Sequence, residues 1–426
     1  MDNTKLNTRE VVLDMLLEVV RNNAHSHILI KNVLDKYNYI EENEKAFIKR
    51  LFEGTLEREI TIDYVINSFS NTPVNKMKPL IRCLMRMSTY QIIYMDRVPD
   101  SAAINEAVKL AKKRKFVNLS GFVNGVLRKV ASNKDSCINT EDICVVYSVS
   151  KVIVDSLTKD YGIDRTKEIL AESLKERHLF VRIREELDKE AKDRIIDEWK
   201  AHNIDYSQHS ALDYAYELDN TENLGRLKCF EAGLYTVQDV ASMMVCENAE
   251  INKDDFVIDV CAAPGGKSLH AISKGAVVES RDVSDYKVSL IEENRERLGA
   301  DRLCTKVWDA TVLDESAIEK ADILLADVPC SGLGVMGRKP DIKRNVTEDG
   351  LDSICNLQKS IMDTVWKYTK IGGTLMYSTC TLRKAENENM VEYLTTNYPF
   401  ELVKMETMFP DDNHDGFFIA RLKRIG

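Results

Sequence analysis

The second half of the sequence alternates short apolar runs with amphipathic stretches, and this alternation constrains the fold more than any other feature. Stretches with helical spacing, such as residues 285–299 and 354–370, separate five runs that read as strands. The five runs are residues 255–264, 276–283, 303–310, 321–330 and 372–380. This alternation predicts a doubly wound α/β domain, a parallel sheet with helices on both faces. Residues 400–408 and 416–424 flank a polar turn and predict an antiparallel hairpin at the sheet edge.

The first 130 residues read instead as one helix after another. Their apolar side chains recur at helical spacing in the ranges 8–23, 45–59, 78–95, 99–113 and 118–132. The polar stretch 132–142 interrupts this periodicity, and mixed helical and strand-like segments follow it. We therefore expect three parts. They are an all-α domain over 1–138, a small α+β module over 139–232 and the α/β domain over 233–426.

Charge is distributed unevenly along the chain. The net charge of -10 by itself argues against a polyanionic partner. Residues 70–134 nevertheless carry 13 Lys or Arg against 3 Asp or Glu, including the run "KKRK" at 112–115. A solvated helix face explains one such run equally well, but the excess extends over several segments and favours a basic surface for nucleic acid.

The ten cysteines form neither a Cys-x-x-Cys pair nor a Cys/His cluster. Their spacing is typical of a reducing compartment and predicts neither a disulfide framework nor a metal site. The polar start and the absence of an apolar run of about 18 residues predict no membrane span and no export. We therefore expect a cytoplasmic protein.

A glycine turn follows the first strand of the α/β domain. Ligands of such sheets bind outside the carboxyl ends of the strands, where this chain reads "CAAPGGKS" at 261–268. A phosphate-binding P-loop requires a glycine five residues before Gly266, and Cys261 stands there instead. The dinucleotide pattern Gly-x-Gly-x-x-Gly is absent too. The turn therefore suits a ligand that lies against the backbone without a phosphate.

Two carboxylates mark the ends of the next two strands. Asp282 is placed to accept both hydroxyls of a ribose, and Asp309 to accept a hydrogen bond from an exocyclic amine such as that of adenine. Either acid alone is more often a solvated turn residue. Together with the glycine turn they indicate a bound nucleoside, and S-adenosylmethionine fits because no phosphate site is present.

Two thiols stand at the ends of the last two parallel strands. The fourth strand ends in Asp327, Pro329 and Cys330, and the fifth ends in Cys380. Because Pro329 cannot continue a central strand, the chain leaves the sheet there. Either thiol alone reads best as a small core hydrophobe. Two thiols at neighbouring strand ends, flanked by hydroxyl residues and close to an acid, favour a catalytic pair.

The motifs "DVCAAPGGKS", "DVPCSGLGVMGRKPDI" and "YSTCTLRKAENE" resemble those of the cytosine-5 RNA methyltransferases of the Nop2/Sun group, which have a class I, Rossmann-like S-adenosylmethionine fold. The likeness extends over 233–423. The N-terminal segment, with "LFEGTLER" and "FVNGVLRK", is similar to the RNA-binding antitermination factor NusB. The two resemblances in one chain imply small-subunit ribosomal RNA, free or partly assembled, as the partner. We expect the protein to be a monomer.

The resemblance also implies roles for single residues. The residues that it implies for binding S-adenosylmethionine are Cys261, Ala262, Ala263, Pro264, Gly265, Gly266, Lys267, Asp282, Asp309 and Asp327. Cys380 would be the nucleophile, and Cys330 would assist release of the product. From the chemistry of the reaction rather than from the resemblance, we expect Asp327 to stabilise the ring of the target cytosine and Lys267 to favour the thiolate of Cys380.

Three alternatives stay open at this point. A DNA cytosine-5 methyltransferase shares the fold and the Pro-Cys motif, but it does not need a Thr-Cys on the fifth strand. A transfer-RNA methyltransferase of the same group has the same active-site residues. A non-catalytic RNA-binding protein with a degenerate methyltransferase domain is disfavoured by the intact Asp327, Cys330 and Cys380.

Overall fold

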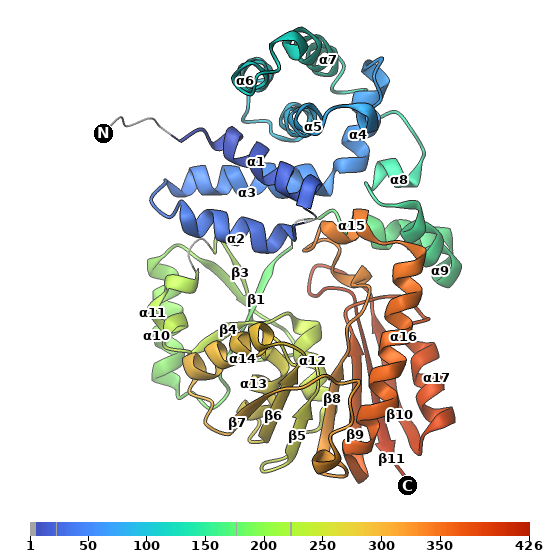
Figure 1. Ribbon diagram of the computed structural model, residues 1–426. Helices are drawn as coiled ribbons and strands as arrows, with labels where there is room; N and C mark the ends of the chain where they lie inside the picture. Colours follow the sequence, from blue (N-terminus) through green and yellow to red (C-terminus); the bar gives the residue numbers. More distant parts are fainter. Residues whose placement is uncertain (1–5, 23, 176, 222–223) are drawn as a thin grey trace. The chain divides into compact units, whose positions relative to one another are not determined.

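In the computed structural model of the chain, the described residues are 6–22, 24–175, 177–221 and 224–426 (Figure 1). They divide into two compact units, Met1–Thr158 with Arg338–Val346 and Lys159–Gly337 with Thr347–Gly426. The first five residues of the polar start, on which the expectation of no export partly rests, lie outside the described part. Among the described helices, none combines the length and the apolar character that a membrane span requires.

The first unit is helical, as the periodicity predicted. Its main helices are α1 (Thr8–Asn22), α2 (Ser26–Lys36), α3 (Glu42–Glu57), α4 (Glu59–Phe69), α5 (Pro79–Tyr94), α6 (Asp100–Lys113), α7 (Ser120–Ser132) and α8 (Ile143–Val146). Helix α5 is buried on most of its faces, and it packs against α1, α3, α4, α6 and α7. The apolar residues on all sides of this helix are therefore explained by a central position in the helical unit.

A short segment from the second half of the sequence also belongs to the helical unit. It contains α15 (Asp341–Asn345), which contacts α3. The Asp341 carboxylate accepts hydrogen bonds from the main-chain N–H and the hydroxyl of Ser26, at 2.9 and 2.6 Å. The Lys343 ammonium, 1% exposed, pairs with Glu57 at 3.3 Å. This segment begins inside the motif that carries Pro329 and Cys330, so the chain enters the helical unit between two elements of the α/β domain.

The second unit begins with a small antiparallel sheet. Its strands are β1 (Leu179–Ile183), β2 (Asp205–Gln208), β3 (Ala215–Asp219) and β4 (Tyr235–Val237), in the order β2-β3-β1-β4. Helix α10 (Lys189–Ala201) buries Trp199 against this sheet. The preceding helix, α9 (Lys151–Glu172), is broken at Gly162, which has a φ of 76°. The middle region is thus α+β, and its fourth strand comes from beyond residue 232.

A larger, mostly parallel sheet forms the rest of the second unit, and it confirms the predicted α/β class. Its strands are β5 (Phe256–Asp259), β6 (Val277–Asp282), β7 (Leu303–Val307), β8 (Ala321–Asp327), β9 (Thr369–Thr379), β10 (Phe400–Met408) and β11 (Phe417–Arg424). The order is β10-β11-β9-β8-β5-β6-β7. The pairs from β9 to β7 are parallel, and β11 and β10 are antiparallel to their neighbours, as predicted for the terminal hairpin.

Helices cover both faces of the large sheet (Figure 1). One apolar core joins alternate strand residues such as Ile258 and Leu324 to α16 (Glu348–Val365) and α17 (Glu388–Asn397). The other joins the intervening strand residues, such as Val257 and Leu325, to α12 (Val240–Ala249), α13 (Gly266–Ser273) and α14 (Asp285–Leu298). Because strand side chains alternate between faces, a sheet buried on both sides needs continuous apolar runs, which these strands have.

Candidate active site

The parallel strands bring the motif residues to one edge of the large sheet. Strands β8 and β9 pair in parallel, and Asp327 stands opposite Ser378 in their register. Strand β5 lies on the other side of β8, and β6 lies beyond β5. The glycine turn after β5 and the Pro-Cys and Thr-Cys motifs therefore leave the sheet side by side.

The two thiols predicted as a pair lie in direct contact. The sulfurs of Cys330 and Cys380 are 3.3 Å apart, and both residues are half-buried. The hydroxyls of Ser331 and Thr381 share a hydrogen bond of 2.7 Å beside them. The Gly334 N–H donates to the Cys380 carbonyl at 3.0 Å. Three contacts thus join two loops that are 50 residues apart in sequence.

The close approach of the sulfurs affects their ionisation. The hydrogen bond with Cys380, together with burial, raises the pKa of the Cys330 thiol well above its ordinary value. Cys330 is therefore held as a neutral thiol near pH 7. A neutral thiol can donate its hydrogen to a neighbouring sulfur, which favours a negative charge on that neighbour.

Lys267 and Asp327 form an ion pair beside the thiols. The Lys267 ammonium lies 2.6 Å from one carboxylate oxygen of Asp327, and the Ser378 hydroxyl donates to the other at 2.9 Å. The exposed side-chain fractions are 11% for Lys267 and 28% for Asp327. Burial opposes the charge of Lys267, but the Asp327 carboxylate outweighs it and raises the pKa of Lys267, to which Cys380 also contributes. Lys267 is therefore a fixed positive charge near Cys380.

The glycine turn is anchored to the neighbouring strand β6. Gly265 has a φ of 100°, a conformation that favours glycine, and its N–H closes the turn on the Ala262 carbonyl at 2.6 Å. The Ala263 N–H donates to the Asp282 carboxylate at 3.0 Å. Pro264 follows Ala263 through a cis peptide bond. Beside Gly266 an added Cβ would meet only Gln238, at 3.9 Å, so the backbone is accessible there.

The two predicted nucleoside-binding acids have different surroundings. Asp282 ends β6 and is buried, and Lys287 lies 3.1 Å from its carboxylate. Asp309 lies two residues beyond the end of β7 and is exposed. Hydrogen bonds from the N–H and hydroxyl of Thr311 hold the pKa of Asp309 below its ordinary value. Both carboxylates follow neighbouring strands, and both can accept further hydrogen bonds.

Cys261 begins the turn, and its surroundings differ from those of the thiol pair. Burial raises the pKa of its thiol, so Cys261 stays neutral near pH 7. Asp259 is buried beside it and accepts a hydrogen bond from the Ser268 hydroxyl at 2.7 Å. Burial raises the pKa of Asp259 to about 6. Sequence reasoning gave Asp259 no role, and the structure shows that it fastens the start of α13 to β5.

The residues of this edge fit S-adenosylmethionine. The turn leaves backbone without a side chain at Gly266, where an extended aliphatic chain can lie. The carboxylates of Asp282 and Asp309 are acceptors for hydroxyl and amine donors of a nucleoside. The Gly-x-Gly-x-x-Gly and P-loop patterns that a bound pyrophosphate would require are absent from the sequence. The donor and acceptor set therefore matches a nucleoside ligand that carries no phosphate.

Three residues of this edge had no sequence-based assignment. Ser378 binds Asp327, Glu386 binds the loop of Cys330, and Gln358 binds both that loop and Glu386. Ser378 and Glu386 stand in the "YSTCTLRKAENE" motif, so their position next to a strand end was visible. Gln358 lies inside a helical stretch, and a buried polar residue there has no signature in the sequence.

Two groups of described residues have the spacing of metal ligands. They are His178, Glu217 and Asp219, and Glu185, Glu247 and His270. In the second group, the Lys274 ammonium lies 2.7 Å from Glu247 and 3.4 Å from Glu185. A side-chain cation thus takes the place beside these carboxylates that a metal ion would need. This group is an ion-pair cluster that joins α12, α13 and the loop after β1.

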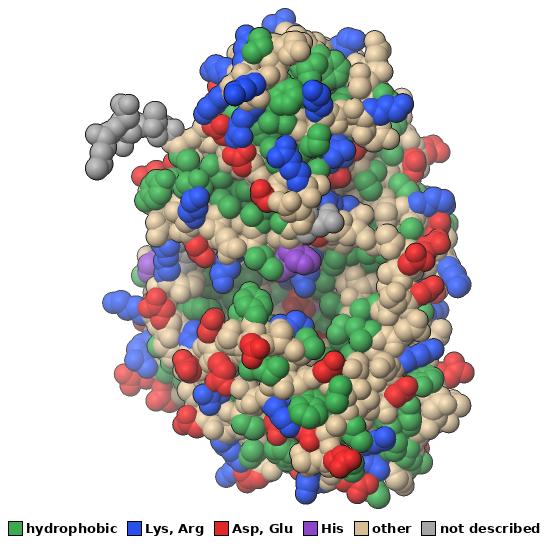
Figure 2. Space-filling model, viewed as in Figure 1, with side chains coloured by type: hydrophobic (Ala, Val, Ile, Leu, Met, Phe, Trp, Pro, Cys, Tyr) green, Lys and Arg blue, Asp and Glu red, His purple; other side chains and the backbone are tan. Residues whose placement is uncertain are grey.

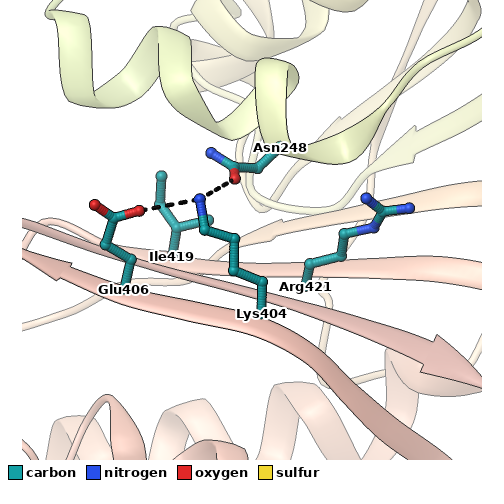
Figure 3. A pocket seen from close by; sticks show the side chains of 5 residues that line it. All are labelled: Asn248, Lys404, Glu406, Ile419 and Arg421. Carbon is teal, nitrogen blue, oxygen red and sulfur yellow. Dashed lines mark hydrogen bonds and ion pairs between the residues drawn. The ribbon is translucent and has the colours of Figure 1, made fainter.

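A surface pocket lies between α12 and the β10–β11 hairpin (Figure 3). It is lined by Asn248, Lys404, Glu406, Ile419 and Arg421. The Lys404 ammonium donates to the Asn248 side chain at 3.0 Å and pairs with Glu406 at 3.2 Å. Arg421 pairs with Glu250. Asn248, Lys404 and Glu406 thus interact with one another inside the pocket, and the candidate catalytic residues do not line it.

The loop that carries Cys330 is held by a close glycine contact, which leads to a first prediction. A Cβ at Gly334 would lie 1.9 Å from the Gly416 carbonyl oxygen and 2.9 Å from that of Cys380. Gly334→Ala is therefore expected to lower the free energy of unfolding by about 1–3 kcal/mol, as overpacking does. Denaturant unfolding measures this. Gly125→Ala in α7, where nothing lies within 4 Å, is the matched control and should not destabilise. Equal stability of the two variants would contradict the close contact.

Comparison with known proteins matches both halves of the sequence to protein families. Residues 248–423 match the family described as 16S rRNA methyltransferase RsmB/F, and residues 6–132 match the NusB family. A probable ribosomal RNA small subunit methyltransferase B of Bacillus subtilis is 32% identical, with 99% of this chain and 100% of the relative covered. Its counterpart in Synechocystis is 28% identical over 98% of this chain and 100% of the relative.

Solved structures resemble the chain as well. PH0851 superposes with a TM-score of 0.82 at 20% identity, covering 98% of this chain and 99% of the other. NSun6 from Pyrococcus horikoshii superposes with a TM-score of 0.59 at 21% identity, covering 65% of this chain and 98% of the other. These structures and the two family matches confirm the predicted fold, a class I methyltransferase domain preceded by a NusB-like helical domain.

Proposed function

The chain belongs to the 16S rRNA methyltransferase RsmB/F family, whose members depend on S-adenosylmethionine, and from this premise we propose that it methylates carbon 5 of a cytidine in small-subunit ribosomal RNA. The observation that carries the proposal is the contact between Cys330 and Cys380, 3.3 Å apart. A general methyltransferase needs no thiol, whereas methylation of carbon 5 of cytosine needs a nucleophile and a means of releasing it.

Cys380 is the nucleophile in this proposal. Carbon 5 of cytosine is too weak a nucleophile to attack a sulfonium methyl group unaided. Addition of the Cys380 thiolate to carbon 6 forms a carbon–sulfur bond and turns the ring into an enamine, whose carbon 5 can then take the methyl group. The fixed charge of Lys267 and the neutral thiol of Cys330 both favour a thiolate at Cys380.

Asp327 stabilises the ring during this addition. Negative charge that enters at carbon 6 spreads to ring nitrogen 3, and Asp327, once it has taken up a proton from solvent, can give that proton or a hydrogen bond to the nitrogen. Ser378 and Lys267 each hold one carboxylate oxygen of Asp327, which fixes the orientation of the group. A carboxylate fixed by two partners loses little entropy when it engages the base.

Cys330 assists the last step. The methylated ring still carries a proton on carbon 5 and a bond from carbon 6 to the Cys380 sulfur. Removal of that proton re-forms the double bond between carbons 5 and 6, and the bond electrons to sulfur return to Cys380 as a thiolate. Cys330 touches Cys380, and because its thiol is neutral, it assists by donating a hydrogen bond to the departing Cys380 sulfur or by holding the group that takes the proton.

S-adenosylmethionine, when bound, supplies the electrophilic methyl group. The glycine turn from Cys261 to Lys267 would hold its methionine portion, Asp282 its ribose and Asp309 its adenine. Asp327 lies beside this turn through its ion pair with Lys267, so the same contact joins the cofactor side of the site to the thiols.

We propose that residues 1–138 bind the RNA, residues 139–232 form an accessory module and residues 233–426 carry the chemistry. Arg86 and Arg114 of the basic stretch pair with acids of their own unit, so part of the charge is neutralised. Exposed basic residues outside the ion pairs of the described chain include Lys76, Lys78, Arg97, Lys112, Lys115, Arg128 and Lys129. Figure 2 shows Lys and Arg side chains over α5–α7. A target base must leave its stack to reach the thiols, which favours a loop nucleotide.

RNA affinity should therefore depend steeply on salt. The double variant Lys112→Ala/Lys115→Ala is expected to weaken RNA binding and to reduce the slope of log affinity against log salt by roughly 0.7 for each lost phosphate contact. Filter binding from low to high salt measures this slope. Two exposed lysines of α10, Lys189 and Lys200, give the matched control double variant, which should keep the wild-type slope. If both double variants have the same slope of log affinity against log salt, the assignment of RNA binding to residues 1–138 is wrong.

The direct test of the proposed function is a map of 5-methylcytosine. Small-subunit ribosomal RNA, transfer RNA and double-stranded DNA are incubated separately with the protein and S-adenosylmethionine, and 5-methylcytosine is located by bisulfite sequencing. We expect one methylated cytidine in ribosomal RNA. Methylation of transfer RNA alone would show that transfer RNA, and not ribosomal RNA, is the substrate. Methylation of another atom or of no cytidine would overturn the proposed reaction.

A further inference from the structure

Glu386 is a fully buried carboxylate that the proposed reaction does not use. It lies between β9 and α17. One of its oxygens accepts a hydrogen bond from the main-chain N–H of Ser331 at 2.8 Å, and the other accepts one from the Arg383 guanidinium at 3.1 Å. The first contact reaches the residue that follows Cys330, from a loop 55 residues away in sequence.

Gln358 of α16 completes this arrangement. Its side-chain amide donates to the Pro329 carbonyl at 2.9 Å and to Glu386 at 3.3 Å, and the residue is fully buried. The carbonyl before Cys330 and the N–H after it are therefore both held by buried side chains. Because β8 ends at Asp327 and Pro329 has no N–H to donate, these side chains hold the backbone where the described ladder of β8 and β9 has ended.

We propose that Glu386 and Gln358 are positioning residues that hold the Cys330 thiol against Cys380 for release of the methylated base. This inference rests on the proposed function. Glu386 and Gln358 hydrogen-bond the backbone on either side of Cys330, and through it they act on the thiol. The Glu386 carboxylate also forms an ion pair with the Arg383 guanidinium, so its negative charge is balanced within the protein.

The proposed role of Glu386 and Gln358 concerns release of the methylated base and not formation of the adduct. Addition of Cys380 and methyl transfer precede the step that needs Cys330. A displaced Cys330 loop should therefore leave the carbon–sulfur bond to form and slow only its cleavage. The protein would then accumulate as a methylated covalent RNA adduct, whereas a general loss of structure would lower adduct formation and methyl transfer together.

The test uses Glu386→Gln and Gln358→Ala in the full chain. Gln358→Ala removes no charge, so it remains informative if Glu386→Gln folds poorly. Each variant is mixed with small-subunit ribosomal RNA and S-adenosylmethionine carrying a labelled methyl group. Single-turnover methyl transfer and the fraction of denaturant-stable adduct are then followed in time. Asp322→Asn is the matched control, because Asp322 also accepts a main-chain N–H, from Phe256 at 2.9 Å, at the opposite end of β8.

We expect both variants to accumulate adduct and to release product at least about tenfold more slowly, since a displaced group should cost less than the roughly 10²–10⁴-fold of complete loss of proton transfer. The rate of single-turnover methyl transfer should stay close to that of Asp322→Asn. A parallel loss of methyl transfer and adduct, or release at the control rate, would overturn the positioning role. If Cys330→Ala forms no adduct and the wild-type protein methylates no cytidine, the proposed function itself fails, and this pattern is distinct from the other two.

Discussion

Cys380→Ala is expected to abolish methylation of ribosomal RNA, with a loss of at least about 10³-fold, and to abolish the covalent adduct as well. The reason is that without the carbon–sulfur bond the ring keeps its aromatic character and carbon 5 stays unreactive. The measurements are labelled methyl incorporation under single-turnover conditions and gel electrophoresis of protein and RNA in denaturant.

Two other cysteine variants serve as comparisons for Cys380→Ala. Cys330→Ala should form the adduct and retain it, since the two thiols act at different steps. Cys304→Ala, an exposed thiol on β7, should behave as the wild-type protein. An adduct that survives the loss of Cys380 would assign the nucleophile to another residue. Equal activity of Cys380→Ala and Cys304→Ala would exclude Cys380 as the nucleophile.

Asp327→Asn is expected to lower the rate of methyl transfer by roughly 10²–10⁴-fold, the usual contribution of a positioned acid or base. The amide has the same shape, but it cannot take up a proton and pass it to ring nitrogen 3. It also leaves the buried Lys267 ammonium without a charged partner, so a loss of about 3 kcal/mol in the free energy of unfolding is expected in addition. Single-turnover kinetics and denaturant unfolding separate the two effects.

Ser378→Ala is the control for Asp327→Asn. It removes one hydrogen bond to the same carboxylate and keeps the ion pair with Lys267, so its effect on rate should be smaller. The unfolding measurement is made in the presence and absence of S-adenosylmethionine, because a bound ligand stabilises the folded state. A wild-type rate for Asp327→Asn would remove the carboxylate from the chemistry.

Much of the fold could be predicted from the residues in order. The periodicity of apolar side chains predicted the helical N-terminal part, the five parallel strands and the terminal hairpin. The structure departs from these predictions at the end of one strand and where a segment of the second half of the chain joins the helical unit. The third strand stops two residues before Asp309, and residues Arg338–Val346 belong to the helical unit. Such an excursion has no local pattern, because it depends on partners such as Ser26 and Glu57 that lie far away in sequence.

The basic stretch shows a similar limit. Composition predicted an excess of positive charge over 70–134. It did not show that Arg114 is paired with Glu10 and Asp14 of α1, since those acids belong to a helix about 100 residues earlier. A count of charges therefore overstates the surface that is available to phosphates.

The sequence by itself determined which chemical groups stand at the ends of the strands, because strand and helix periodicity locates those ends whatever the final packing. It thereby determined that thiols, carboxylates and a glycine turn share one edge of a sheet. Only the tertiary structure decided which of them touch. Three contacts join residues 50 to 60 positions apart in sequence. They are the contact of Cys330 with Cys380, the ion pair of Lys267 with Asp327 and the hydrogen bond of Glu386 to the Cys330 loop. Their distances depend on strand order and register, which are set by packing of the whole sheet and by no local pattern.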